Sequence, residues 1–225
     1  MKIKLILFIT LVLVLSSCSV YKNPISEDHS LVDNDTDDNL IADKVTYNSI
    51  SADWPAYEDV EDLVEAGNII LMGKVTDISF QVLDDRTGEP PSEETKEADR
   101  SLYTIYDVDV IRSYKGDFLE TTKVRMLGGQ EGFRVDEQVK ALGEDAQKGI
   151  TIIKGRPEIL IGESYLFVLY QYEDTIPTLV NMEQGVYDVN DPLEKDWYSF
   201  VSAKDIISYF GEDKWDEFTK ENGGW

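Results

Sequence analysis

Carboxylates make up most of the side chains in this sequence that could do chemistry. Asp107 and Asp109 lie two residues apart in the stretch SLYTIYDVDVIRSYKGD. In a strand both acids would share one face, and the apolar residues Tyr106, Val108 and Val110 would take the other. Two acids on one face could act as general acid and base, or bind a cation. The same alternation is typical of the solvent side of a strand, which is the interpretation we favour.

Other catalytic chemistry has few residues available. The sequence has one histidine, His29, and one cysteine, Cys18, which argues against Ser-His-Asp or Cys-His catalysis and against a histidine-rich zinc site. No GxGxxG or P-loop motif occurs, and the Gly128-Gly129 pair suits a tight turn better than a phosphate site. A second, weaker group of acids follows this pair: Glu131, Asp136 and Glu137. We therefore expect no enzymatic activity, no cofactor and no metal site.

Two aromatic residues form another candidate site. Trp197 and Tyr198 are adjacent in DPLEKDWYSF and could form an exposed platform for a sugar or a peptide. The alternative, which we favour, is that they pack the last helix onto the rest of the domain.

Cys18 lies at the end of an apolar run. Two lysines precede residues 5–15, which are apolar except for one threonine, and two serines separate this run from the cysteine. This layout is typical of an export signal, although an uncleaved membrane anchor stays open. The sequence LSSC also resembles the lipobox of bacterial lipoproteins. The resemblance implies that residues 1–17 are a signal peptide and that a diacylglycerol is attached to the Cys18 sulfur. The alternative is an ordinary secretory signal with an incidental cysteine.

The charge of the chain limits its partners. Without residues 1–17, which contain two of the 21 basic residues, the formal net charge is −26. Such a density opposes binding to nucleic acid, and it means that a lipid chain rather than charge must hold the protein on a membrane. A protein or peptide partner, or another cationic one, is expected. We expect the protein to be exported and lipid-anchored on the outer surface of the cell membrane.

Residues 18–52 are predicted to be an acidic, disordered tether because they offer little apolar surface to bury. Acids occupy positions 1, 3 and 5 of a possible calcium loop in DNDTDDNLIADK. Asp38, however, takes the place of the turn glycine, and Lys44 takes the place of the bidentate acid. A solvated tether is therefore the favoured interpretation.

Residues 53–225 are predicted to form one mainly β domain, a small closed barrel with a helix at each end. The expected strands lie in residues 68–83, 101–115, 121–130, 157–174 and 175–189, and the expected helices in 57–66 and 202–222. Residues 130–157 show no clear period. The stretch SYLFVLY is apolar at both alternating sets of positions, so both of its faces should be buried, one in the barrel and one beneath the C-terminal helix.

The pattern IILMGKV, YTIYDVDVIRSYKGD, VRMLGGQ, ILIGESYLFVLY and QGVYDV resembles a family of bacterial surface proteins. The resemblance covers residues 65–190 and implies an OB-fold barrel similar to the netrin and tissue-inhibitor-of-metalloproteinase module. Inhibitors of that group chelate the metal of a protease with a free N-terminal cysteine, whereas Cys18 here is the expected lipid site.

These observations predict a membrane-anchored surface lipoprotein with a non-enzymatic OB-fold-like binding module. The ligand should bind at loop 84–101 or at segment 130–157. An inhibitor of an extracellular peptidase is the first alternative, and a carboxylate-dependent hydrolase is the second.

Overall fold

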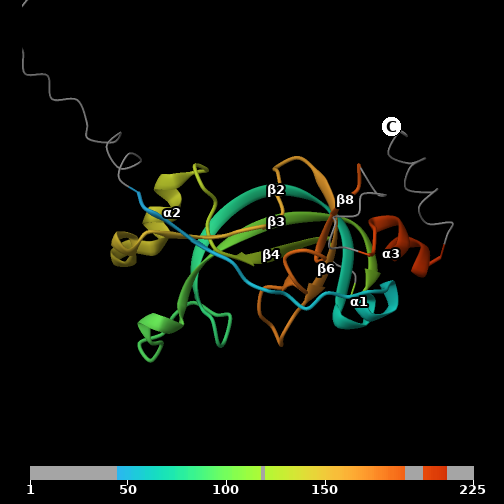
Figure 1. The fold of residues 1–225 in the computed structure, drawn as a ribbon, viewed down its shortest axis with the longest axis horizontal. Coiled ribbons are helices and arrows are strands. Elements are labelled where there is room, and N and C mark those ends of the chain that lie inside the picture. The colour runs from blue at the N-terminus through green and yellow to red at the C-terminus, as the bar shows by residue number, and fades with distance from the viewer. Residues whose placement is uncertain (1–44, 118–119, 191–199, 212–225) are drawn as a thin grey trace, which may run out of the picture. The chain divides into compact units, whose positions relative to one another are not determined.

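The computed structural model describes residues 45–117, 120–190 and 200–211 (Figure 1). The chain divides into two units, Met1–Asp37 and Asp38–Trp225, and the described residues all belong to the second. Cys18, Trp197 and Tyr198 lie outside the described residues, as does most of the predicted tether. No helix within the described ranges combines the length and the apolar character needed to cross a membrane.

The elements follow one another in the order β1 (Tyr47–Ile50), α1 (Val60–Ala66), β2 (Ile69–Asp84), η2 (Glu97–Asp99), β3 (Arg100–Lys115), β4 (Thr121–Leu127), α2 (Val135–Leu142), η3 (Gly143–Lys148), β5 (Ile150–Ile153), β6 (Ser164–Tyr170), β7 (Thr178–Leu179), β8 (Val186–Asp188) and α3 (Ala203–Tyr209). Strands thus predominate, and three short α-helices flank them. Helices α1 and α3 and most strands lie within the predicted ranges, whereas α2 lies in the segment for which the sequence predicted no element.

The main sheet closes on itself. Its strand order is β2-β3-β4-β7-β6-β8, and β2 also pairs with β6. Strand β2 can close the barrel because it is long: Ile69 to Lys74 pair with β6, while most of the strand pairs with β3. Neighbours are antiparallel except β4 and β7, which are parallel. The predicted fold class, a mainly β OB-like barrel with flanking helices, is confirmed.

Gly73 allows β2 to bend from one partner to the other. The register between β2 and β3 shifts at Met72/Gly73 and at two neighbouring points, and such bulges increase the local twist of a strand. A Cβ atom at Gly73 would collide with the Val108 side chain. The backbones can therefore approach closely only because residue 73 is glycine.

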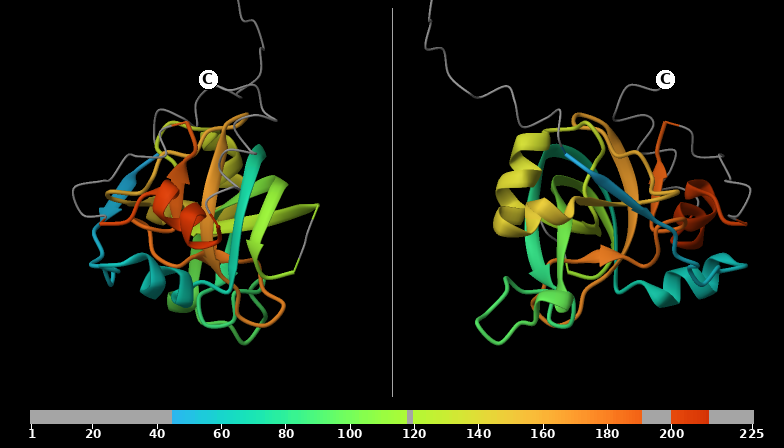
Figure 2. Two further views of the ribbon diagram at one scale, coloured as in Figure 1. Left: turned by 90° about the vertical axis from the view of Figure 1, so that its right-hand side faces the viewer. Right: turned by 60° about the vertical axis from the view of Figure 1, so that its left-hand side comes forward.

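Strand β6 is buried on both faces, as predicted. Tyr165, Phe167 and Leu169 belong to the core inside the barrel, whereas Leu166 and Val168 belong to a second core on its outer side. This outer core is completed by α1 and α3, through side chains that include Leu63, Ile206 and Ile207. Figures 1 and 2 show α1 and α3 beside β6 and β8, with α2 at the opposite end of the barrel. The rest of the predicted C-terminal helix, from residue 212 onward, lies outside the described residues.

The segment without clear period folds as α2, η3 and β5, and β5 pairs in parallel with β1. Strand β1 lies inside the predicted tether, so the paired part of the chain begins N-terminal to the predicted domain boundary at residue 53. Three of the four β1 residues are exposed. Backbone pairing with β5 therefore holds this strand. Because such pairing does not require buried side chains, β1 shows no alternation of apolar residues from which the sequence could have predicted it.

Candidate functional site

The structure places Asp107 and Asp109 on the outer face of the barrel. Tyr106 before them and Val108 between them are buried, as the alternation predicted. Asp107 lies opposite Asp77 of β2 and forms an ion pair with Lys123 of β4. Neither acid lines any of the pockets described below. The two acids therefore share an exposed face, without a cleft that would bring them to a common substrate.

The second group of acids is divided between two places. Asp136 and Glu137 lie in the first turn of α2, and Glu137 pairs with Arg134 at 3.7 Å. Glu131 instead lines a pocket. Among the residues that the structure describes, no group of three or more His, Cys, Asp or Glu side chains is arranged to hold a metal ion.

That pocket, here called the Arg156 pocket, has a volume of about 330 Å³. It forms where the chain leaving β4 meets the chain leaving β5, within the region that the sequence indicated. Its walls are largely apolar, with Phe133, Ile152, Pro157 and Leu160, and its polar side chains are few: Gln130, Glu131, Arg156 and Glu158. Apolar walls with a few convergent polar groups are typical of small-ligand sites.

Glycines and a buried glutamine shape the loop that forms one wall. Gly128 has φ of 88°, and a side chain at Gly129 would collide with Gln138. Gln138 of α2 is fully buried. Its amide donates to the carbonyl oxygens of Gln130 at 2.6 Å and Phe133 at 2.5 Å, and it accepts from the Gln130 N–H at 2.9 Å. These bonds fix residues 130–133 beside the barrel.

The polar end of the Arg156 pocket is anchored to the barrel interior. The hydroxyl oxygen of Tyr106 accepts from an Arg156 guanidinium nitrogen at 2.7 Å and from the Gln130 amide at 3.1 Å. A second guanidinium nitrogen of Arg156 donates to the Gly129 carbonyl. Tyr106 is itself fully buried, in the barrel core. This contact orients the guanidinium between the core and the pocket.

Burial raises the pKa of Tyr106, and the neighbouring Arg156 and Gln130 oppose that rise. The hydroxyl therefore stays protonated at neutral pH. Because its oxygen already accepts two hydrogen bonds, its own proton is left for a further acceptor.

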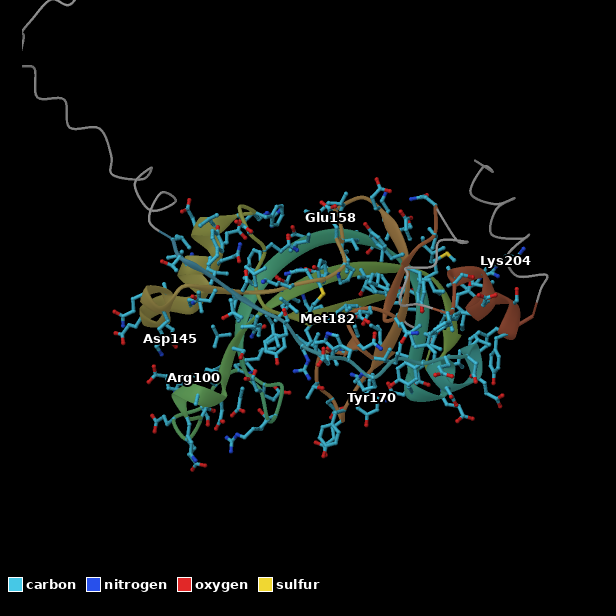
Figure 3. The ribbon with its side chains drawn as sticks, viewed as in Figure 1. Arg100, Asp145, Glu158, Tyr170, Met182 and Lys204 are labelled. Carbon is cyan, nitrogen blue, oxygen red and sulfur yellow. The ribbon has the colours of Figure 1, made fainter. Side chains whose placement is uncertain are left out.

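The Arg156 pocket contains charged side chains of both signs. Arg156 is partly buried, and no carboxylate of the described ranges lies within ion-pair distance of it. Glu131 and Glu158 are exposed and line the same pocket, and Figure 3 shows Glu158 at the edge of the barrel. A cation at the inner end thus faces two acids near the solvent.

Loop 84–101, the other region indicated by the sequence, is a well-bonded structure. Asp84 is buried and accepts from the Arg86 N–H at 2.9 Å, the Thr95 hydroxyl at 2.8 Å and the Arg86 guanidinium at 3.2 Å. These bonds, in that order, lower the pKa of Asp84 to about 2. The loop borders a more polar pocket of about 460 Å³ that includes Arg86, Glu89 and residues 172–175.

Arg125 lies beneath this loop. Its guanidinium stacks on the Tyr103 ring at 5.6 Å and leaves no room for a side chain at Gly88. The Nε and one terminal nitrogen of Arg125 are buried without a hydrogen-bond partner in the structure. Arg125 packs against the loop at Gly88 and does not line the polar pocket.

The sequence identified the two regions but missed Tyr106, Gln130, Gln138 and Arg156 as a group. Each of these residues looks ordinary when taken alone. The signal that could have indicated the group was the turn sequence GGQ at residues 128–130, followed by a glutamine within the next segment at Gln138. No protein-family model matches the chain, and the search of curated proteins found no relative.

Proposed function

We propose that this protein is an exported lipoprotein, anchored through Cys18, and that its OB-like barrel is a non-enzymatic binding module. The ligand site is the Arg156 pocket. One observation carries this assignment: Arg156, held by the buried Tyr106 hydroxyl, lines an apolar-walled pocket in which no described carboxylate pairs with its guanidinium.

The position of the Arg156 pocket supports the proposal. Small barrels of this kind bind ligands along one sheet face and the adjoining loops, and the Arg156 pocket is built by the connection between β4 and β6. Arg156 joins it to the barrel core through the hydrogen bond to Tyr106, whereas Glu131 and Glu158 are exposed. A ligand can therefore enter from solvent and still meet groups whose positions the core fixes.

The lipid anchor and the charge are consistent with a surface receptor. The LSSC motif supports attachment at Cys18, and the acidic segment after it supports an extended tether. With a formal charge of −26 after removal of residues 1–17, the protein would attract partners of positive charge. Asp107 and Asp109 give no support to the hydrolase alternative, because they lie on the exposed outer face.

The test is capture of envelope components by the chain from residue 18, made soluble by Cys18→Ser. Three baits are compared: this protein, the same protein with Arg156→Met, and a matched control with Lys154→Met. Lys154 is exposed and carries the same charge two residues away, but it does not line the pocket.

We expect a set of molecules that the parent and Lys154→Met baits retain and the Arg156→Met bait loses. Thermal melting of each bait shows whether the fold survives, and Arg156→Lys provides a variant that keeps the charge while losing the guanidinium fork. Equal capture by all folded baits would refute the assignment of the site.

A further inference from the structure

The Arg156 pocket limits the chemistry of its ligand. We propose that it binds the free carboxyl terminus of a peptide that also carries positive charge: the carboxylate lies against Arg156, and the basic group faces Glu131 and Glu158. This inference rests on the proposed binding function and adds the class of ligand.

The inner end of the pocket requires an acceptor. A guanidinium has five N–H donors in a planar fork, and only two of the Arg156 donors are used by Gly129 and Tyr106. A carboxylate meets this need, because its two oxygens match the guanidinium fork.

The outer end of the pocket excludes most simple anions. Glu131 and Glu158 line the pocket and are exposed, and no described basic side chain forms an ion pair with either. Together with the acidity of the whole domain, they repel a phosphate or a dicarboxylate from solution. A ligand that brings its own positive charge reverses this repulsion while its carboxylate still reaches Arg156.

The apolar walls of the pocket indicate which group the ligand carries between its carboxylate and its positive charge. Phe133, Ile152 and Leu160 present apolar surface, and Leu160 is 50% exposed, so an apolar side chain beside the carboxylate would remove it from water. The volume of about 330 Å³ lies near the lower end of the ~300–1,000 Å³ range of small-ligand pockets. It suits the last residues of a peptide rather than a folded surface.

The experiment is calorimetric titration of the Cys18→Ser chain with the peptide Lys-Lys-Phe-Leu. Three further probes separate the features of the ligand: the same peptide with a C-terminal amide, the peptide Glu-Glu-Phe-Leu, and free lysine. We expect amidation and Arg156→Lys each to weaken binding of the parent peptide about tenfold or more, about 1.4 kcal/mol. Lys154→Met should leave it unchanged.

The acids are tested by Glu131→Gln and Glu158→Gln, with Glu144→Gln as an exposed control outside the pocket. Each pocket variant should weaken Lys-Lys-Phe-Leu about two- to fivefold and improve binding of Glu-Glu-Phe-Leu. Rescue of the acidic peptide would not follow from mere damage to the fold.

The outcomes separate this inference from the proposed function. If the amide binds as well as the free carboxylate, or if free lysine binds as tightly as the peptide, the peptide carboxyl terminus is refuted as the ligand. If no probe binds while capture of envelope components still depends on Arg156, the ligand class is wrong and the binding site stands. If Arg156→Met changes neither measurement, both proposals fail.

Discussion

Phe167 is the side chain whose removal should test the barrel most directly. It is fully buried in the middle of β6, and its ring lies 6.0 Å from that of Tyr165 inside the barrel. Truncation to alanine removes apolar surface from a core that the closed sheet holds in place.

The expected loss has two parts. Burying an aromatic side chain of this size contributes about 1.5–3 kcal/mol. A cavity adds about 24 cal/mol per Å³, so ~60–80 Å³ left unfilled would cost about 1.5–2 kcal/mol. Because β6 is paired on both sides, with β2 and with β7 and β8, the strand cannot move inward to fill that space. Phe167→Ala should therefore lower the free energy of unfolding by about 3–5 kcal/mol.

Urea titration followed by tryptophan fluorescence and circular dichroism measures this loss. Three variants accompany it as comparisons. Leu166→Ala, on the opposite face of the same strand, should cost about 2–5 kcal/mol because α1 and α3 cover it. Asp109→Asn, on the exposed face of β3, should stay within about 0.5 kcal/mol, and Asp107→Asn within about 1 kcal/mol because it loses a surface ion pair.

A neutral Phe167→Ala would refute this account of the barrel. If an aspartate variant were then strongly destabilised, the assignment of the strand faces would be inverted. A large effect at Phe167 with none at Leu166 would leave the barrel intact but refute the helical cover.

Three further predictions follow from other parts of the chain. Metabolic labelling with a fatty-acid analogue should mark the wild type and not Cys18→Ala, and label retained on the variant would contradict the lipobox. Removal of residues before 45 should leave the melting temperature within a few degrees, whereas a fragment starting at residue 53 should melt lower because it loses β1, and equal melting of the two fragments would show that β1 is dispensable. The hydrogen bonds to Asp84 depress its pKa from 3.8 to about 2, so their stabilisation is fully present above about pH 4 and is lost as the pH falls toward 2. Urea titration should therefore show that the difference in unfolding free energy between wild type and Asp84→Asn becomes smaller as the pH falls across that window. A difference that does not change with pH would exclude the ionised Asp84 carboxylate as its cause.

The sequence alone determined the features that depend on local pattern. Alternation placed Tyr106 and Val108 inside the barrel and Asp109 outside, because successive side chains of a strand point to opposite faces. Apolar residues at every position of YLFVLY indicated a strand covered on both sides, and the structure confirms two cores there. Ser202 caps α3 through Asp205, a bond that the three-residue spacing of the two side chains permits.

Only the tertiary structure decided which distant residues meet. Tyr106 and Arg156 are 50 positions apart, and Asn48 and Lys148 are 100 apart. Such pairs depend on how the sheet closes and in which register, and a side chain that donates one hydrogen bond carries no sign of its acceptor in the sequence. Strand β1 was missed for the same reason, since backbone pairing with β5 holds it and its side chains remain exposed. The candidate site is therefore a product of the tertiary fold, which brings Arg156 to the hydroxyl of a buried tyrosine and to the carbonyl oxygen of Gly129.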